Sequence, residues 1–340
     1  MKTKNSFFSF KAVLAACISL FIGFSAAAQD AWVTERQKAK DSVLEDRLEI
    51  KVSFLADTLC QGRGLRTRGH SEAAMWVQRQ FEDAGMIPFG NSWFRHFHVE
   101  GRTYGRNVIG LLPSARTIPC DRYIIVGAHY DHLGTLGGKM YPGADANASG
   151  VVAMATLADM FGQMRKMGKI LGSNIIFVAF DAKELDMKGS QSLWDMLEYG
   201  SLRNPLTGEE ITKEKIALMV NIDQIGSTLA PVHEDREDYL IMLGTQSLKR
   251  SDRNLLASCN TENGINLDIA LDYYGSENFT NIFYRLSDQK VFVDNRIPAV
   301  LFTSGITMNN NKDRDTVETL NMEVFRKRIW LMYHWLEKML

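Results

Sequence analysis

Histidine and carboxylate side chains stand directly after several short apolar segments of the sequence. His129 and Asp131 follow one such segment, and Glu184 and Asp223 follow two others. Asp145 lies in a glycine-bearing loop after the first segment. A cluster of one imidazole and several carboxylates suits a divalent cation, because the cation relieves the repulsion between like charges. These positions, Asp131 apart, are therefore predicted metal ligands.

Asp131 has a different expected role. A metal-bound histidine usually gives the proton of its other ring nitrogen to a carboxylate, which fixes its tautomer and direction. The spacing His129-x-Asp131 therefore predicts that Asp131 orients His129. Four further histidines do not stand in such a context and are predicted to have no role in the site: His70, His96, His98 and His334.

The elements that must position these residues alternate between strands and helices. Apolar, partly β-branched segments predict strands buried on both faces of a sheet at 123–128, 174–180, 216–222 and 297–302. Helical patterns cover 31–60, 71–85 with Ser71 as N-cap, 148–164, 188–198 and the C-terminal end. This order predicts an α/β fold, a three-layer sandwich with a mixed, mostly parallel central sheet. In open sheets of this kind, ligands bind beyond the carboxyl ends of the strands, where acids distant in sequence converge.

Composition and charge narrow the class of protein. The chain has 340 residues, of which 45% are hydrophobic and 23% charged, as in an ordinary globular protein. Without the first 28 residues the formal net charge becomes −4 instead of −1, because three lysines and no acidic residue are lost. This balance argues against nucleic acid or an anionic membrane as a partner. No segment reads as a linker, so 29–340 is predicted to be a single domain.

The first 28 residues predict a secretory signal peptide. They carry a lysine-bearing start, the apolar stretch AVLAACISLFIGF and the small residues SAAA. We therefore expect an exported protein, periplasmic or secreted, with no membrane span after removal of the signal. Lipoprotein processing at Cys17 is the alternative that ranks lower. Three cysteines would remain, so at most one internal disulfide is expected among Cys60, Cys120 and Cys259.

A series of motifs along the chain resembles a known family. The motifs are VGAHYDHLG, YPGADANASG, IIFVAFDAKELDMKGS, LMVNIDQIG, SDQKVF and NNKDRDT. In this order and spacing they are similar to the co-catalytic zinc exopeptidases of the aminopeptidase Y and bacterial leucyl aminopeptidase type, to which glutaminyl cyclases are related. The resemblance covers nearly all of the chain after residue 28. It implies the zinc-exopeptidase fold and hydrolysis of amino-terminal residues from peptides.

The resemblance also implies roles for single residues. His129 and Asp223 correspond to ligands of one zinc ion, and Asp145 corresponds to the carboxylate that bridges two ions. Glu184 falls on the carboxylate ligand of the other ion, and Asp131 falls on the partner that orients the histidine.

Four positions depart from the family pattern. Lys183 stands where active members carry the glutamate that acts as general base, and Asn311 stands where a histidine completes the second zinc site. The family's paired aspartates become Asp145-Ala146, and its SDH becomes SDQ, ending at Gln289. Because zinc prefers nitrogen or sulfur ligands, the change at 311 weakens the second site. We therefore expect one zinc ion rather than two, or none.

The position of Lys183 leaves two possibilities open. Its ammonium group could replace the missing ion and pair with Glu184 and Asp145, or it could point into solvent as long charged side chains often do. His132 or His233 could also replace the lost histidine ligand.

These departures define the expected function. The first hypothesis is an exported metallo-aminopeptidase-family protein with impaired or lost peptidase activity, a possible pseudoenzyme whose pocket binds peptides or amino-terminal groups. The alternatives are an active aminopeptidase with a single metal ion and a non-catalytic interaction protein.

Overall fold

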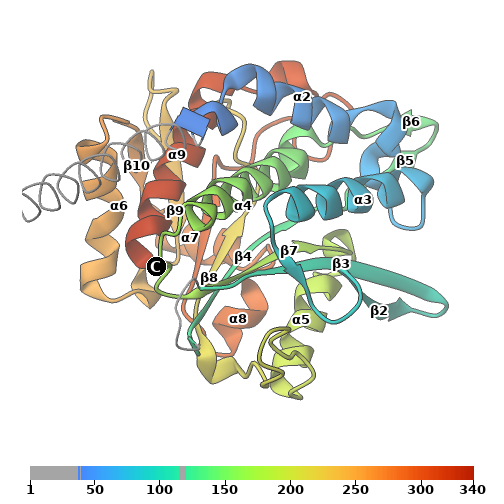
Figure 1. The fold of residues 1–340 in the computed structure, drawn as a ribbon. Helices are drawn as coiled ribbons and strands as arrows, with labels where there is room; N and C mark the ends of the chain where they lie inside the picture. Colours follow the sequence, from blue (N-terminus) through green and yellow to red (C-terminus); the bar gives the residue numbers. More distant parts are fainter. Residues whose placement is uncertain (1–36, 39, 115–119) are drawn as a thin grey trace, which may run out of the picture.

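One mixed β-sheet runs through the part of the chain that the structure describes, which in this computed structural model is residues 37–38, 40–114 and 120–340 (Figure 1). In this part nine strands form the sheet, in the order β1-β3-β7-β4-β8-β11-β9-β10 with β2 beside β3. The predicted signal peptide and Cys17 lie outside the described residues. Within them, no helix combines the length and the apolar character that crossing a membrane requires.

The strands of the sheet are short, and those at its centre are almost entirely buried. Their bounds are β1 (Ile87–Pro88), β2 (Phe94–Glu100), β3 (Thr103–Leu112), β4 (Tyr123–His129), β7 (Asn174–Phe180), β8 (Ile216–Ile222), β9 (Tyr239–Leu243), β10 (Asp268–Ala270) and β11 (Ala299–Thr303). A separate two-stranded hairpin consists of β5 (Thr135–Leu136) and β6 (Lys139–Met140). The four predicted strands correspond to β4, β7, β8 and β11.

The centre of the sheet is parallel and its flanks are antiparallel. β4 pairs with β7 on one side and with β8 on the other, and β8 pairs with β11, all in parallel. β3 and β9 flank this centre in antiparallel pairs with β7 and β11. The carboxyl ends of the four central strands therefore lie at one edge of the sheet. The structure confirms the predicted mixed, mostly parallel α/β architecture.

Side chains of a central strand alternate between two separate cores. In β7, Ile175 and Phe177 face one core, whereas Ile176 and Val178 face the other. Because successive side chains of a strand point to opposite faces, a strand buried on both sides must be apolar throughout. This requirement explains the uninterrupted apolar sequence NIIFVAF.

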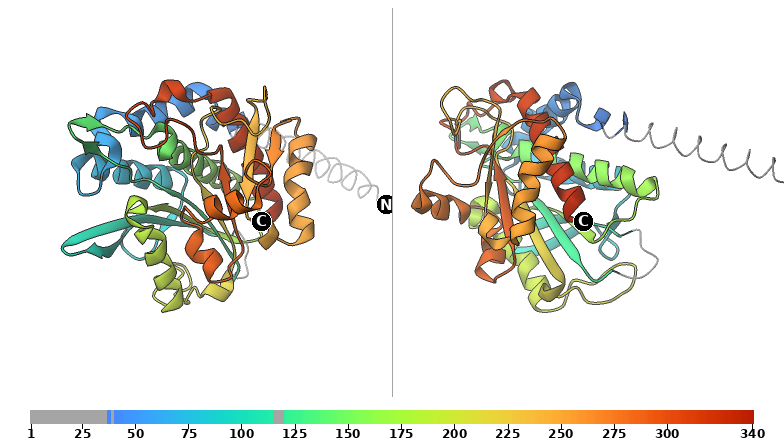
Figure 2. Two further views of the ribbon diagram at one scale, coloured as in Figure 1. Left: turned by 180° about the vertical axis from the view of Figure 1, so that it is seen from behind. Right: turned by 90° about the vertical axis from the view of Figure 1, so that its left-hand side faces the viewer.

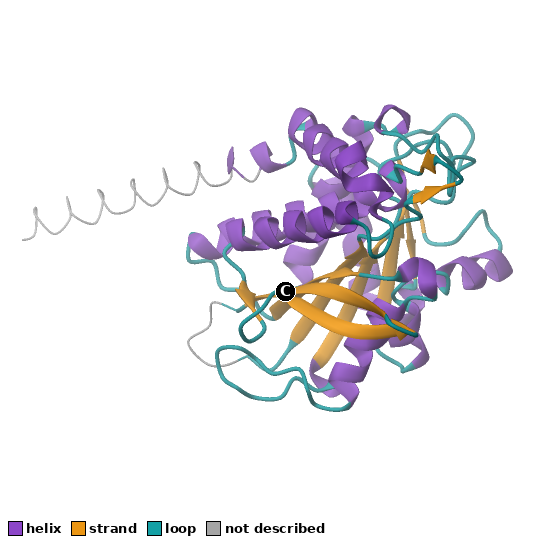
Figure 3. Cartoon of the chain, turned by 90° about the vertical axis from the view of Figure 1, so that its right-hand side faces the viewer, coloured by secondary structure: helices purple, strands orange, loops and turns teal. Residues whose placement is uncertain are grey.

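Helices cover both faces of the sheet (Figures 2 and 3). The larger core lies under α2 (Glu45–Ala56), α3 (Arg68–Asp83), α4 (Gly150–Lys166), α6 (Arg250–Glu262) and α9 (Met322–Met339). The opposite face is covered by α5 (Lys188–Glu198), α7 (Glu277–Tyr284) and α8 (Lys290–Asp294). Figure 1 shows α2, α3 and α4 on one side of the sheet and α5 and α8 on the other.

Two helix predictions need correction. The helix expected over 31–60 is interrupted, because Leu44 has an extended backbone and α2 begins only after it. The next helix does not start at Ser71. Thr67 is the N-cap of α3, and its hydroxyl accepts a hydrogen bond from the backbone N–H of His70 at 3.0 Å. Serine and threonine are both favourable N-caps, so residue type alone does not distinguish Thr67 from Ser71.

The cysteines of the described chain are free thiols. Cys60 and Cys259 are buried, and Cys120 is partly buried.

Candidate functional site

The carboxyl ends of three neighbouring parallel strands bring most of the predicted site residues together. His129 is the last residue of β4, Asp223 follows β8, and Lys183 and Glu184 follow β7. Although 94 residues separate them in sequence, His129 Nε2 lies 3.3 Å from Asp223 Oδ1. The structure thus joins the two residues that the resemblance assigns to one zinc site.

The imidazole of His129 is buried and hydrogen-bonded through both nitrogens. Nδ1 lies 3.1 Å from the backbone carbonyl of Asp131, and Nε2 faces the carboxylate of Asp223. Both partners are hydrogen-bond acceptors, an arrangement that favours a ring protonated on both nitrogens. Burial lowers the pKa of His129, but Asp223 and Asp131 together outweigh burial and raise the pKa to about 10. The charges of His129 and Lys183 in turn outweigh the burial of Asp223 and hold its pKa well below the usual range.

Asp131 fixes the turn that carries Lys183 and Glu184. Its two carboxylate oxygens accept the backbone N–H groups of Lys183 at 3.1 Å and of Glu184 at 3.2 Å. Its Oδ1 lies 3.7 Å from His129 Nδ1, too far for a good hydrogen bond. Asp131 therefore contacts the ring of His129 as predicted, but through its backbone carbonyl, while its carboxylate holds the turn.

Lys183 points into the acidic cluster and not into solvent. Its side chain is 19% exposed, and Nζ lies 3.5 Å from Glu184 Oε1. Burial lowers the pKa of Lys183, but nearby carboxylates, Asp223 and Glu184 foremost, outweigh burial and raise the pKa above its usual value. The group at the position of the family's base is therefore a cation that carries its proton at neutral pH.

Glu184 and His132 lie side by side without a hydrogen bond. His132 Nδ1 is 3.8 Å from Glu184 Oε1, and neither nitrogen of this buried ring has a hydrogen-bond partner. Burial lowers the pKa of His132 and so favours the neutral ring. Burial alone raises the pKa of Glu184, but His132 and Lys183 outweigh burial and lower the pKa to about 2. The structure thus places His132, but not His233, beside a predicted ligand.

Asp145 does not join this cluster. Its Oδ1 accepts hydrogen bonds from the backbone N–H groups of Gly226 at 2.8 Å and Ser227 at 3.2 Å and from the hydroxyl of Ser149 at 3.1 Å. Burial and the neighbouring Asp315 raise the pKa of Asp145 to about 7. To bridge two ions, as the resemblance implies, Oδ1 would have to leave its three donors, since of the two carboxylate oxygens only the buried Oδ2 has no hydrogen-bond partner. Its expected ion pair with Lys183 also has no support, because these contacts turn it toward the 226–227 backbone.

Asn311 and Asp315 lie in the segment that follows β11. Asn311 is exposed and adopts a left-handed backbone conformation with a φ of 57°. Asp315 is buried, and its carboxylate accepts the backbone N–H groups of Asp145 at 2.9 Å and Ala146 at 3.0 Å. The Asp315 carboxylate therefore holds the loop that follows β6 in place.

Sequence reasoning did not find how Asp223 is held. Ser287 donates a hydrogen bond of 2.5 Å to Asp223 Oδ2, and Asn221 Nδ2 donates to Ser287 Oγ and to Gln289 Oε1, each at 2.8 Å. The motif SDQ and the residue two before Asp223 are the signals from which this network could have been predicted. Asp288 of the same motif is fully buried, and burial raises its pKa to about 7.

A cavity of about 250 Å³ opens beside the cluster. Its polar end contains Lys183, Asp223 and Asn311. The rest of the wall is largely apolar, and this part consists of Leu243, Tyr273, Phe283, Leu286, Leu301 and Ile306. The cavity can hold an apolar side chain while a polar group reaches the strand ends.

The side chains as placed do not fit a two-zinc site. Within the described residues, no three histidine, cysteine or carboxylate side chains are arranged to hold an ion. Asp223 uses one oxygen toward His129 and the other toward Ser287, and the ammonium group of Lys183 lies beside Glu184. His129 and Asp223 remain as two adjacent donors, and Asp145 does not supply the third.

Fold and site together define a protein of the metallo-exopeptidase class with an altered centre. The profile of Peptidase family M28 matches residues 107–336, more than half of the chain. The chain belongs to peptidase family M28.

Solved structures of this fold come from several bacteria. The LapA aminopeptidase of Legionella pneumophila superposes with a TM-score of 0.65 at 18% identity, over 88% of this chain and 73% of that one. The glutaminyl cyclase of Porphyromonas gingivalis superposes with a TM-score of 0.62 at 16% identity, over 87% of this chain and 99% of that one. BSAP, a zinc aminopeptidase from Bacillus subtilis, superposes with a TM-score of 0.52 at 19% identity, over 70% of this chain and 50% of that one. The family and the zinc aminopeptidase among these structures suggest zinc as the metal of the site. No curated protein matches the chain significantly.

Proposed function

We propose that this chain is a peptidase family M28 protein with lost or impaired peptidase activity, whose cavity binds peptides through their amino-terminal groups. One observation carries the proposal: the ammonium group of Lys183 lies inside the acidic cluster, 3.5 Å from Glu184. The resemblance places the general base of active relatives at this position.

Lys183 cannot do the work of that base. A general base must accept a proton near the working pH, whereas the surrounding carboxylates raise the pKa of Lys183. A fixed ammonium group also takes the place of a cation among the carboxylates. We therefore expect one bound zinc ion at most.

The cavity retains what a ligand of this class needs. The ammonium group of a peptide's first residue would meet the carboxylate of Asp223, and its side chain would pack against Tyr273 and Phe283, which line the same cavity. We expect free peptides with an apolar first residue to bind and amino-terminally acetylated ones to bind more weakly. Export through the signal peptide at residues 1–28 remains part of this proposal and would expose the cavity to peptides outside the cytoplasm.

The experiment that tests the loss of activity measures metal and turnover together. After zinc exposure and dialysis, elemental analysis should find at most one ion per chain, and a broad panel of aminoacyl substrates should remain uncleaved. Two ions per chain together with cleavage would overturn the proposal.

Variants that restore the residues of active relatives provide a second test of the lost activity. The double variant Lys183→Glu with Asn311→His supplies the base and the nitrogen ligand that the resemblance calls for. Because Asp145 is held by its own donors, the triple variant with Ala146→Asp supplies a carboxylate at the neighbouring position. We expect the triple variant to bind more zinc than the wild type and to gain aminopeptidase activity. If it folds, fills two sites and cleaves nothing, the loss lies in another part of the chain.

An active enzyme with one metal ion is the second candidate function. The observation that favours it is the contact between His129 and Asp223, which keeps two adjacent donors of one site. This function requires that the wild type hydrolyses a substrate. A chelator must abolish the hydrolysis, and the variant Asp223→Ala must lack it. Peptide binding that persists after chelation, together with the absence of hydrolysis, would support the first proposal instead.

A further inference from the structure

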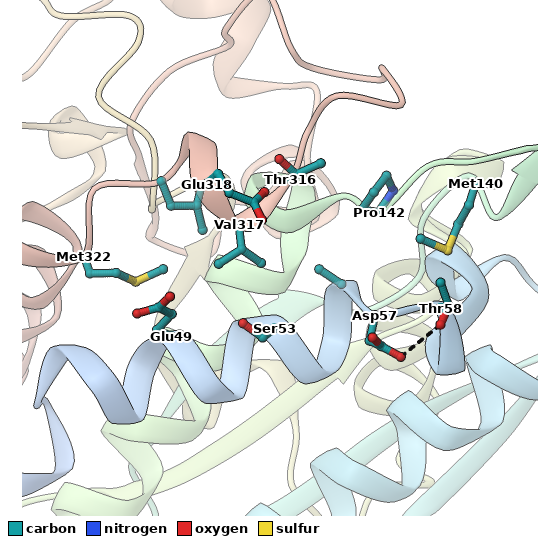
Figure 4. A pocket seen from close by; sticks show the side chains of 12 residues that line it. Glu49, Ser53, Asp57, Thr58, Met140, Pro142, Thr316, Val317, Glu318 and Met322 are labelled. Carbon is teal, nitrogen blue, oxygen red and sulfur yellow. Dashed lines mark hydrogen bonds between the residues drawn. The ribbon is translucent and has the colours of Figure 1, made fainter.

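A second cavity lies apart from the strand ends, between α2 and the segment that leads into α9 (Figure 4). Its volume is about 590 Å³. Figure 4 shows Glu49, Ser53 and Asp57 along α2, facing Thr316 and Val317 across the cavity. We call this cavity the α2 groove.

The α2 groove is acidic at its rim. Glu49, Asp57 and Glu318 are exposed carboxylates of its wall, and none of its lining residues in the described chain is a lysine or an arginine. Of the cations near the lining residues in sequence, Lys139 pairs with Asp313 at 3.1 Å, Arg326 pairs with Glu45 at 3.2 Å, and Lys51 is partly buried and attracted by Asp159. These cations interact with carboxylates outside the groove, so the rim carries an excess of negative charge.

The floor and ends of the α2 groove are apolar. Met322 lies at one end and Met140 at the other, with Pro142 and Val317 between them (Figure 4), and Ala56 also lines the groove. Methionine side chains are flexible and polarizable, so they adapt to different partner side chains. A ligand that matches this wall carries positive charge at its edges and an apolar group between.

The length of the α2 groove suits a short extended peptide. Glu49 and Asp57 are eight residues apart along α2 and its C-terminal end, which corresponds to about 12 Å at 1.5 Å per residue. An extended chain advances about 3.3 Å per residue, so about four steps, from the first to the fifth residue, span this distance. Two cationic side chains at the ends of a five-residue segment point to the same face and would then lie near the acidic rim.

We propose that the α2 groove is a docking site for an extended polypeptide segment that carries two basic side chains with apolar residues between them. The site is independent of the cavity at the strand ends and needs no free amino terminus. Long-range attraction by the carboxylates would steer the basic segment, and the apolar wall would hold it in place.

The probe for this proposal is the capped pentapeptide acetyl-Lys-Leu-Leu-Leu-Lys-amide, added to the full chain in a calorimetric or fluorescence titration. The acetyl group removes the amino terminus, so the measurement does not depend on the function proposed for the other cavity. The control peptide acetyl-Glu-Leu-Leu-Leu-Glu-amide has the opposite charge and the same apolar centre. We expect saturable binding of the basic peptide, weakening as salt concentration rises, and no binding of the acidic one.

Substitutions in the α2 groove test separately how charge and shape contribute to peptide binding. Glu49→Gln and Glu318→Gln should each weaken binding roughly twofold to fivefold, as expected for exposed charge pairs. Ser53→Trp should remove binding, because an indole on the exposed face of α2 would fill the centre of the groove. Glu100→Gln removes an exposed carboxylate at the end of β2 and should leave affinity unchanged. Asp57 is left intact, since its Oδ1 caps the following helical turn at Leu59 with a hydrogen bond of 2.8 Å.

Three outcomes overturn the proposal. They are equal binding of both peptides, unchanged affinity in a folded Ser53→Trp variant, and no saturation at millimolar peptide. A concentration-dependent dimer of the wild type that Ser53→Trp dissociates would assign the groove to a second copy of the chain and would likewise overturn it.

Discussion

At the scale of single residues, one lysine lies where the resemblance places the general base of active relatives. Lys183 and the imidazole of His129 lie among the carboxylates of Asp131, Glu184 and Asp223. Two positive groups thus offset part of the negative charge of three carboxylates. The position of the Lys183 side chain could not be read from the sequence, because a long charged side chain can equally reach solvent.

Removal of this cation should make the fold sensitive to zinc. We expect Lys183→Met to lower the free energy of unfolding by about 1–3 kcal/mol in the presence of a chelator, since partly buried carboxylates lose their partner. Zinc should restore part of this loss in the variant by supplying a cation. Chemical denaturation with and without zinc measures both effects. Lys312→Met, at an exposed position, is the control, and an equal loss in both variants would contradict the expectation.

The buried Asp288 should give stability a measurable pH dependence. Burial raises its pKa in the folded state to about 7, compared with about 3.9 in an unfolded chain. Between these values the folded protein binds more protons than the unfolded chain, so this group's contribution to stability falls as pH rises from about 4 to 7.

The variant Asp288→Asn tests the direction of this pH dependence. Relative to the wild type it should gain stability as pH rises through this window, by up to about 1.4 kcal/mol per pH unit. Denaturation midpoints at several pH values measure the difference, with Asp235→Asn, at an exposed position, as control. A pH-independent difference between Asp288→Asn and the wild type would show that Asp288 does not titrate in this window.

At the scale of elements, the position of the site loops depends on one buried arginine. Arg63 donates hydrogen bonds to the backbone carbonyls of Tyr130, Leu55, Pro142 and Gly143, at 2.9, 2.7, 2.7 and 2.8 Å. These contacts join the short helix after α2 to the loops that follow β4 and β6. The residue is fully buried, so lost contacts cannot be replaced by water.

Arg63→Lys should therefore destabilise the protein although it preserves the charge. A lysine cannot reproduce the planar array of donors, and we expect a loss of about 3 kcal/mol or more from the unsatisfied carbonyls and the poorly paired charge. Thermal and urea denaturation measure the loss, and Arg66→Lys, at an exposed position, should be neutral. A loss within about 0.5 kcal/mol would show that the four contacts do not stabilise the loops.

At the scale of the whole molecule, we expect the stability of the fold to rest on its apolar cores and not on a bound ion. Two apolar cores on the faces of the sheet hold the strand ends in place, and the polar centre lies at their edge. A ligand that binds only the native state raises stability by mass action, so the response to chelation reports how much an ion contributes.

We expect EDTA to leave the Tm of the wild type unchanged. The triple variant Ala146→Asp, Lys183→Glu and Asn311→His should instead lose Tm on chelation, because two added ligands and the replacement of a cation by a carboxylate make its fold dependent on zinc. Differential scanning calorimetry of both proteins, before and after EDTA, measures the contrast. A large drop in the wild type would show that a resident ion stabilises the fold despite Lys183.

The sequence by itself determined the fold class and the places where site residues occur. Apolar segments such as 174–180 specify strands buried on both faces, and the order of strands and helices specifies the parallel centre. The tertiary structure alone decided which side chains meet. Asp145 was predicted to bridge two ions, but the backbone N–H groups of Gly226 and Ser227, distant in sequence, hold its carboxylate elsewhere. Periodicity fixes the face of an element on which a residue lies, whereas the direction of a polar side chain depends on which donors and charges the folded chain brings nearest.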